Sequence, residues 1–410
     1  MYIHRLIRFG SIITLCALIF SACQQEAIVD TSTGGGDDPR GKVISTELIG
    51  SFSTEQIDSI IGIINGAPPE LVFLVKEYPV DVYKVIYETI DAKGQPTFAS
   101  GALSIPQNID EPKAWVSYQH GTVILKDDVP SRGSQEMLIG VVYASASGVV
   151  VSQPDYLGLG DSPGRHPYVH AESQATAAID MMRAGQAVCA DEEITLNDKL
   201  MLFGYSQGGH ATMALHKQLQ ENYADEFVVT ASYPMAGPYD LSGYQAAAIT
   251  NGEPYATKYY LPYLLLSYNE VYDLYDSPSD FLKSPYDQTL PPLFNGENGG
   301  GTINDEIPYI PSDIIRDDVI ENFKYNYNHP FRQVLRDNDN WDWLPDAPVH
   351  LCHCTGDTQV FYENALVAYN GFLDKGKTDV ELITPNSGDH GDCVLPCFID
   401  ALGWFAEFYE

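Results

Sequence analysis

One five-residue stretch constrains the fold of this chain more than any other. Residues 204–208 read Gly-Tyr-Ser-Gln-Gly and fit the G-x-S-x-G pattern, in which a serine sits on a sharp turn between a strand and a helix. The preceding run 199–203 is mostly apolar and strand-like, and 209–216 has the composition of a helix start. Glycines are needed on both sides because a neighbouring Cβ would clash with the strand or the helix. The pattern makes Ser206 a candidate nucleophile.

A serine nucleophile needs a histidine and an acid, which in this arrangement follow it in the order acid, then histidine. Asp357 comes directly after a strand-like run, and His390 is the only histidine that follows Asp357. His390 lies in a glycine-rich stretch that we interpret as a loop. We predict that His390 takes the proton of Ser206 and that Asp357 orients the imidazole. Asp389 and Asp392 rank below Asp357, because adjacent side chains on a loop rarely face each other.

The oxyanion that develops on an attacked carbonyl also needs hydrogen-bond donors. One is expected to be the backbone N–H of Gln207, directly after the nucleophile. The other is expected in the loop 119–122, which follows the predicted strand 114–118 and reads Gln-His-Gly-Thr. We assign this role to the N–H of Thr122. His120 is interpreted as a structural histidine that holds the turn, in preference to a general base or a metal ligand.

Four sequence motifs together resemble a known family. They are Gln-His-Gly-Thr at 119–122, Gln-Pro-Asp-Tyr-Leu-Gly-Leu-Gly-Asp-Ser at 153–162, His-Pro-Tyr-Val-His at 166–170 and Gly-Tyr-Ser-Gln-Gly-Gly at 204–209. The chain is similar, over roughly residues 75–405, to the secretory lipase branch of the α/β-hydrolases, which includes secreted fungal lipases and bacterial cell-wall-degrading esterases. The resemblance implies hydrolysis of carboxylic esters, with lipid or plant-polymer esters as substrates. It also implies the triad Ser206, Asp357 and His390, with Thr122 and Gln207 as oxyanion donors.

The loop that begins at Pro154 contains a second acidic candidate. By the resemblance, Asp155, Tyr156 and the glycines after them pack beside the active site as a structural element. Asp155 precedes Ser206 in the chain, so it does not fit the order of a triad acid. We interpret Asp155 as a residue that accepts hydrogen bonds from loop backbone N–H groups.

The remaining sequence pattern predicts an α/β fold. Residues 81–89 and 97–105 alternate in polarity and predict an antiparallel hairpin. Further strands then alternate with helical runs such as 171–188 and 207–223, which is typical of a mostly parallel sheet covered on both faces. The predicted strands are 114–118, 148–153, 199–203, 229–234, 348–354 and 380–384.

The composition changes to Tyr, Pro, Asn and Asp between about residues 240 and 345. We interpret this segment as a largely helical cap over the nucleophile that supplies an apolar acyl pocket, with most of its tyrosines packing the cap onto the core. The crowded tyrosines are Tyr255, Tyr259, Tyr260, Tyr263, Tyr268, Tyr272 and Tyr275. The predicted organisation is a signal peptide at 1–22, a tether at 23–43, a first core part at 44–239, the cap at 240–345 and a second core part at 346–410.

The N-terminus resembles an export signal. Basic residues precede the apolar run 9–20, which is too short for a spanning helix, and Ser-Ala-Cys follows it. Cys23 is therefore predicted to carry a lipid, and the polar, glycine-rich residues after it to form a flexible tether. The protein is expected to be exported and held at a membrane, facing the periplasm or the cell surface. Lys and Arg number 22 against 56 Asp and Glu, which argues against nucleic-acid binding.

Four cysteines cluster in sequence near Asp357 and His390. Cys352, Cys354, Cys393 and Cys397 fit no common zinc spacing, although His353 is a possible zinc ligand. In an exported chain we favour at least one disulfide between 352–354 and 393–397, with the pairing open, and a buried free thiol at Cys189. Residues 337–342 (Asp-Asn-Asp-Asn-Trp-Asp) lack the glycine and glutamate of a calcium loop and predict a solvated turn. No metal or cofactor is expected.

The sequence thus predicts an exported serine esterase or lipase that forms an acyl-enzyme on Ser206 and acts on a small or polymer-linked ester. One alternative is a serine aminopeptidase-like enzyme on the same fold, since acidic residues of the cap could bind a free amino terminus. The other is a non-catalytic surface lipoprotein that binds glycan or lipid. Turnover of esters, of amides, or of neither separates the three.

Overall fold

The computed structural model describes residues 39–63 and 77–409. The predicted signal peptide, Cys23 and most of the predicted tether lie outside the described residues. Contacts with the core begin before residue 44, because Arg40 Nε donates to Asp180 Oδ2 at 3.0 Å and Arg40 Nη1 donates to the Tyr223 hydroxyl at 2.9 Å. The C-terminal end of the predicted tether therefore belongs to the folded unit.

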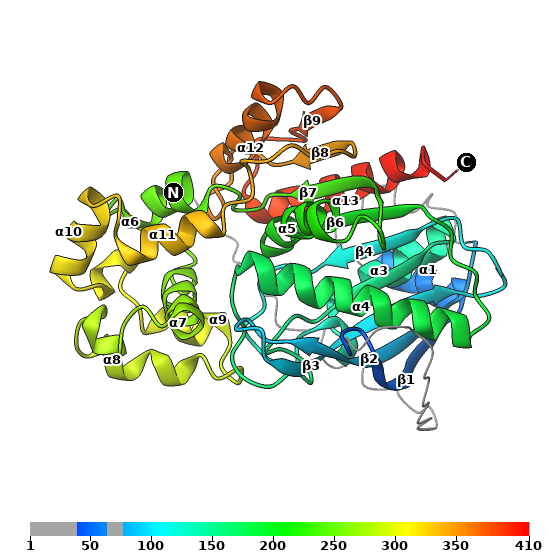
Figure 1. Cartoon of the computed structure of the whole chain (residues 1–410), viewed down its shortest axis with the longest axis horizontal. Coiled ribbons are helices and arrows are strands. Elements are labelled where there is room, and N and C mark those ends of the chain that lie inside the picture. The colour runs from blue at the N-terminus through cyan, green and yellow to red at the C-terminus, as the bar shows by residue number, and fades with distance from the viewer. Residues whose placement is uncertain (1–38, 64–76, 410) are drawn as a thin grey trace, which may run out of the picture.

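The described residues form a nine-stranded sheet in the order β1-β2-β3-β5-β4-β6-β7-β8-β9 (Figure 1). β1 to β3 pair antiparallel, β3 pairs antiparallel with β5, and the remaining pairs are parallel. The predicted hairpin and the mostly parallel sheet are confirmed, and β1 is a strand that the sequence analysis did not identify. The strands are β1 Val43–Phe52, β2 Val80–Ile90, β3 Pro96–Pro106, β4 Trp115–Gln119, β5 Val150–Pro154, β6 Leu200–Tyr205, β7 Val229–Met235, β8 Val349–Cys352 and β9 Val380–Ile383.

Helices cover both faces of the sheet. One face packs on α1, α3 and α13, and the other on α4, α5 and α12 (Figure 1). Neighbouring residues of one strand point to opposite faces, so Val116 joins the first core and Trp115 the second. The bounds are α1 Thr54–Ile63, α3 Gln135–Ser147, α4 Ala171–Asp191, α5 Gln207–Asn222, α12 Glu363–Asp374 and α13 His390–Ala406.

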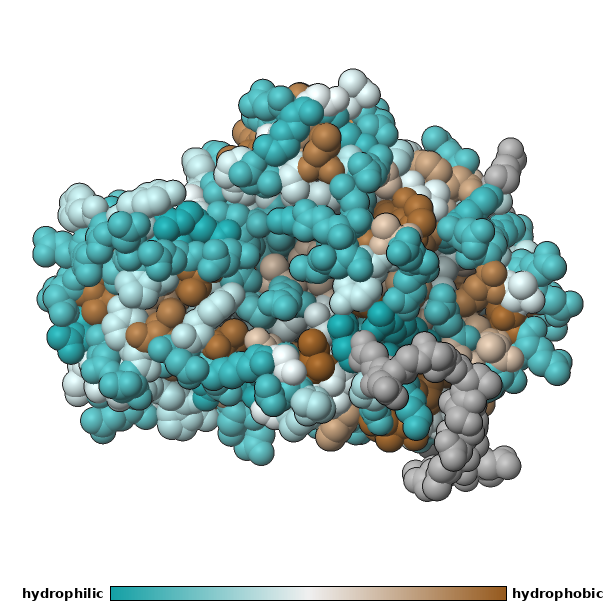
Figure 2. Space-filling model, in the orientation of Figure 1, coloured by the Kyte–Doolittle hydropathy of each residue, from teal (hydrophilic) through white to brown (hydrophobic). Residues whose placement is uncertain are grey.

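The chain between β7 and β8 forms a helical unit at one end of the sheet, on the left in Figure 1. It has an apolar core of its own, to which α7 contributes Leu261, Leu265 and Leu266. Its surface is largely hydrophilic, with apolar patches between polar side chains (Figure 2). Its helices are α6 Ala246–Thr250, α7 Tyr260–Tyr272, α8 Tyr286–Thr289, α9 Gly300–Asp305, α10 Asp317–Tyr325 and α11 Pro330–Asp337.

Residues 337–342 do not form the solvated turn that their polar composition predicts. Asn338 and Asn340 are buried. Asn338 Oδ1 accepts a hydrogen bond from the Ala171 N–H at 2.7 Å, and Asn340 Nδ2 donates to the His210 carbonyl oxygen at 3.2 Å. These amides satisfy backbone groups at the start of α4 and in α5, so the segment fastens the helical unit to the core. Among the described residues, no cluster of His, Cys, Asp and Glu could hold a metal ion.

A helix needs about twenty mostly apolar residues to cross a bilayer. Within residues 39–63 and 77–409, no helix meets this requirement.

Candidate active site

Ser206 lies on the turn between β6 and α5, with φ 61° and ψ −120°. This backbone conformation is strained for a residue with a side chain, and the Ser206 N–H donates to the Met235 carbonyl oxygen at 2.9 Å. A Cβ on Gly204 would come within 2.5 Å of the Gln119 carbonyl oxygen, and a Cβ on Gly208 within 1.9 Å of the same atom. Only glycine fits at these two positions, as the sequence pattern predicted.

Asp357 follows β8 and accepts four hydrogen bonds. Its Oδ1 accepts from the N–H groups of Gln359 and Val360, both at 2.9 Å. Its Oδ2 lies 2.5 Å from Nδ1 of His390 and 3.0 Å from Nε2 of His353. Burial acts to raise the pKa of the Asp357 carboxyl, but the hydrogen bonds from the two imidazoles outweigh burial and hold the pKa well below its usual value. The carboxylate is therefore ionised and rigidly held.

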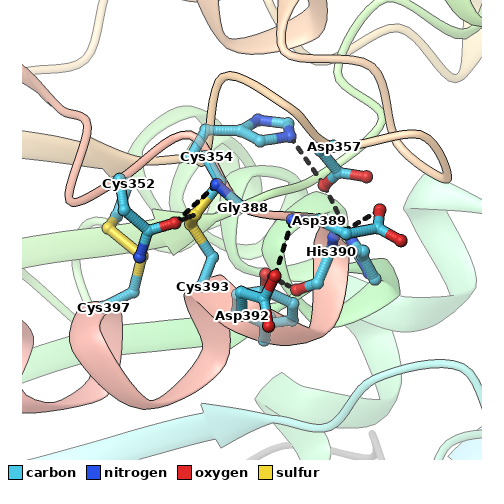
Figure 3. Close-up of a disulfide and its surroundings, with 12 residues drawn as sticks. Cys352, Cys354, Asp357, Gly388, Asp389, His390, Asp392, Cys393 and Cys397 are labelled. Atoms are coloured by element: carbon cyan, nitrogen blue, oxygen red, sulfur yellow. Dashed lines mark hydrogen bonds and ion pairs between the residues drawn. A yellow bond between two sulfur atoms is a disulfide. The ribbon is translucent and has the colours of Figure 1, made fainter. Parts of the chain in front are cut away.

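His390 is the first residue of α13, which corrects our interpretation of this segment as a loop. Asp389 caps the helix: its carboxylate accepts from the His390 N–H at 2.7 Å, while Asp392 Oδ2 accepts from the Asp389 N–H at 2.9 Å. Gly388 thus leads into a capping box at the start of α13. The Asp389 carboxylate is occupied by the helix start and by the Thr358 hydroxyl at 2.9 Å, whereas Asp357 contacts the imidazole. Figure 3 shows these side chains together.

Tyr205 connects His390 to the turn that carries Ser206. The Tyr205 hydroxyl donates to the His390 carbonyl oxygen at 2.6 Å, and the two rings lie 5.1 Å apart between centroids. Within the described residues the Ser206 hydroxyl forms no hydrogen bond with the His390 ring. Such contacts often tighten only when substrate binds. The structure thus brings Asp357 and His390 together beside Ser206, and their catalytic roles stay predictions.

Two disulfides join the end of β8 to α13 (Figure 3). Cys352 pairs with Cys397, and Cys354 pairs with Cys393. The prediction of at least one disulfide between these segments is confirmed, and so is the buried free thiol of Cys189. The Cys354–Cys393 bond lies three residues from Asp357 and three from His390, so it holds together the two segments that carry the acid and the histidine.

We expect the two disulfides to differ in their effect on activity. They close segments of similar length, with sequence separations of 45 and 39, so removing either one by double Cys→Ser substitution should cost a similar free energy of unfolding, about 2–4 kcal/mol. Only the Cys354/Cys393 double variant should also lower kcat severalfold, because that bond spaces Asp357 from His390. Calorimetry and ester hydrolysis measure the two effects. Equal losses of kcat in both double variants would contradict this assignment.

The loop after β4 lies against the serine turn. A Cβ added to Gly121 would lie 3.5 Å from the Tyr205 carbonyl oxygen. In the described part of the chain, neither the N–H of Thr122 nor that of Gln207 has a protein acceptor. Gln207 is the first residue of α5, where backbone N–H groups are free to bind an anion. Both N–H groups are thus available for the oxyanion role that the sequence predicts.

The loop with Asp155 packs beneath this site. Asp155 Oδ1 accepts from the Ser131 N–H at 3.0 Å, and Oδ2 accepts from the hydroxyls of Ser100 and Ser131. The His120 ring packs on Tyr156 at a tilt of 39° with centroids 4.3 Å apart, and its Nε2 lies 3.1 Å from the Asp155 carbonyl oxygen. Asp155 therefore sits in a structural hydrogen-bond network, and no contact links it to His390.

An apolar pocket lies at Ser206, and most of its remaining lining comes from the helical unit. Within the described residues, its lining contains no Asp, Glu, Lys or Arg. Of the cap tyrosines named above, only Tyr260 is among its lining residues. The lining is formed mainly by Tyr168, Val169, Leu241, Ile249, Tyr260, Leu261, Leu264, Leu265, Phe281, Val319, Ile320, Phe323, Phe331 and Leu335.

Sequence reasoning missed two contacts at this site. The sequence suggests His353 only as a possible zinc ligand, yet its ring contacts Asp357. His166 Nε2 lies 2.7 Å from Gln207 Nε2, and its Nδ1 lies 2.8 Å from the Leu157 carbonyl oxygen. Burial lowers the pKa of His166 to about 4, so its ring is neutral and accepts from the Gln207 amide. The sequence signal for His353 was its position four residues before the acid.

The mostly parallel sheet, the strained serine turn and the helical insertion define an α/β-hydrolase with a cap. The family model described as secretory lipase matches residues 131–410, so the chain belongs to the secretory lipase family. Fold and family together give a hydrolase of the esterase and lipase type. No functionally curated protein matches the sequence significantly.

Solved structures agree with this placement. A Legionella pneumophila protein named as a hydrolase is 27% identical, with a TM-score of 0.83 over 89% of this chain and 98% of that chain. The rice cell wall degrading esterase LipA from Xanthomonas oryzae is 28% identical, with a TM-score of 0.77 over 90% and 96%. Candida antarctica lipase A is 17% identical, with a TM-score of 0.66 over 90% and 82%, and shows likeness of fold alone.

Proposed function

We propose that this protein is an exported serine hydrolase of carboxylic esters that forms an acyl-enzyme on Ser206. The observation that carries the proposal is the position of Ser206. It lines an apolar pocket and lies on a strained turn beside the His390–Asp357 pair. Membership of the secretory lipase family and the likeness to esterase LipA support the ester bond as the target.

The proposed reaction has two halves. His390 removes the proton of Ser206 as its oxygen attacks the ester carbonyl, and Asp357 stabilises the imidazolium. The N–H groups of Thr122 and Gln207 bind the oxyanion. His390 then gives the proton to the leaving alcohol, and water, activated by the same histidine, releases the acid from Ser206. No step in this sequence calls on a metal or cofactor.

The pocket favours an acyl chain over a peptide amino terminus. An aminopeptidase-like enzyme binds the free ammonium group with a carboxylate or a tyrosine cluster near the nucleophile, and the lining described above supplies two tyrosines, Tyr168 and Tyr260, but no carboxylate to balance the charge. A non-catalytic binding lipoprotein does not require the strained backbone of Ser206, whose cost is of the kind kept at functional sites. We therefore propose esters with an apolar acyl group as substrates.

A series of 4-nitrophenyl esters from acetyl to palmitoyl, alongside an aminoacyl 4-nitroanilide, tests the substrate class. We expect ester turnover that rises with acyl length, and no anilide cleavage. Ile320→Trp should lower turnover of long-chain esters by about tenfold or more relative to acetyl ester, because the indole shortens the pocket. Leu373→Trp, on the exposed side of α12, is the control. Anilide cleavage without ester turnover would favour the peptidase.

The proposal includes attachment to a membrane through a lipid on Cys23, with the enzyme facing the periplasm or the cell surface. Its support is the sequence Ser-Ala-Cys after an apolar run. We expect the wild-type protein to sediment with membranes and the Cys23→Ala variant to lose this association. A Cys23→Ala protein that still sediments with membranes would exclude the lipid on this residue.

A further inference from the structure

A second imidazole contacts the carboxylate that we assign as the triad acid. His353 is completely buried, and its Nε2 lies 3.0 Å from Asp357 Oδ2 and 2.8 Å from the Val360 carbonyl oxygen. Both neighbours are hydrogen-bond acceptors, so Nε2 carries the hydrogen in the tautomer that this network requires. In the described part of the chain Nδ1 has no partner, although it is buried. Leaving this nitrogen unpaired costs free energy that a phenylalanine at the same position would not incur.

The contact falls on the oxygen that also binds His390. Asp357 Oδ2 receives both imidazoles, while Oδ1 receives the two backbone N–H groups of Gln359 and Val360. The carboxylate is therefore fixed in plane by four donors and cannot rotate away from His390. The donor that His353 provides also draws negative charge from Oδ2, the atom that stabilises the imidazolium of His390.

We propose that His353 is a positioning residue for ester hydrolysis: its N–H fixes the Asp357 carboxylate and sets how strongly that carboxylate attracts the proton held by His390. This inference rests on the proposed function. His353 lines no part of the pocket at Ser206 and touches no reacting atom. It acts through Asp357 alone, and the bond to Val360 holds the loop 357–360 against the ring.

Other titratable groups surround this pair. His390 faces it from α13, together with Asp389 and Asp392 at the start of that helix. Tyr205 faces it from β6 and Tyr255 from the cap, and the Asp357 charge contributes to the raised pKa of both tyrosines, behind burial. Tyr362 packs edge-on against the His353 ring, with centroids 5.8 Å apart. Of these groups only His390 donates to Asp357 Oδ2 within the described residues, so His353 is the further donor to vary.

His353→Phe and His353→Gln test the proposal. Phenylalanine keeps the ring shape without the N–H, and should lower kcat about ten- to hundredfold with KM unchanged, the size expected for losing one hydrogen bond to a charged group. The acid limb of the kcat/KM profile should move to higher pH by about half a pH unit, because a more negative Oδ2 favours protonated His390. Glutamine retains an N–H within reach and should restore most of both losses. His350→Phe, on β8 three residues before His353, is the matched control.

A second measurement does not depend on turnover. In protein with ¹⁵N-labelled histidine, the NMR titration of His390 should move to higher pH in His353→Phe and stay unchanged in His350→Phe. A His353→Phe protein with a lower Tm but with unchanged pH profile, unchanged titration and unchanged kcat per folded molecule would reduce His353 to a packing residue and overturn the proposal. If the wild-type protein hydrolysed no ester, the proposed function would fail, while the titration would still decide whether His353 acts on His390.

Discussion

Replacing Ser206 by alanine should lower ester hydrolysis by about four to six orders of magnitude, leaving a residual rate from the oxyanion donors and substrate binding alone. The loss is expected because Ser206 lies on a strained turn and lines the apolar pocket, with the His390–Asp357 pair beside it. The folded structure should persist, because Ser206 Oγ donates no hydrogen bond within the described residues. The measurement is kcat/KM for the preferred 4-nitrophenyl ester.

Ser104→Ala is the matched control for this substitution. Like Ser206, Ser104 is buried, and its hydroxyl has no hydrogen-bond partner in the described part of the chain, but it lies on β3 and does not line the pocket. Its variant should keep the wild-type rate. A Ser206→Ala protein that hydrolyses the ester at the wild-type rate would show that another group is the nucleophile.

Replacing Asp357 by asparagine should lower kcat by about 10⁴-fold, the loss expected when the triad imidazole is held in the wrong tautomer. An asparagine amide that turned its N–H₂ toward His390 Nδ1 would force the hydrogen onto Nε2, the nitrogen that must accept the serine proton. Asp357 is the carboxylate within 2.5 Å of His390 Nδ1. The loss should appear in kcat, measured under saturating ester.

Asp389→Asn distinguishes the acid from its neighbour in sequence. Asp389 caps α13 and accepts from Thr358, and asparagine caps a helix about as well, so its replacement should cost at most about 1 kcal/mol of unfolding free energy, from the lost charge at the helix start, and only a small part of the activity. If Asp389→Asn lost as much kcat as Asp357→Asn while remaining folded, the assignment of the acid would be reversed.

The local features of this site could be predicted because short sequence signals encode them. Gly204 and Gly208 are required by distances of 2.5 Å or less to neighbouring backbone, so the glycines around Ser206 reveal the turn directly. Asp357 follows a strand, and the order of acid and histidine along the chain leaves few choices. The alternation of strands and helices likewise predicts a mostly parallel sheet, because the helices that connect parallel strands cover both faces of the sheet.

Features that depend on tertiary contacts could not be predicted. The segment around His390 contains Gly388, Gly391 and Pro396, so it resembles a loop, although Asp389 and Asp392 form a capping box at the start of the 17-residue helix α13. Residues 337–342 have the composition of a solvated turn, yet Asn338 and Asn340 are buried because their amides bind backbone of α4 and α5. The disulfide pairing requires knowing how distant segments meet, and the contact of His353 with Asp357 depends on how the chain turns after β8.

Covalent trapping tests the central claim most directly. The protein would be treated with a 4-nitrophenyl alkylphosphonate, which transfers its phosphonyl group to an activated serine, and the adduct located by mass spectrometry of peptides. The account predicts one adduct, on Ser206, formed in step with the loss of ester hydrolysis and missing from Ser206→Ala. Loss of hydrolysis with the adduct on another residue, or full hydrolysis by a protein labelled on Ser206, would contradict it.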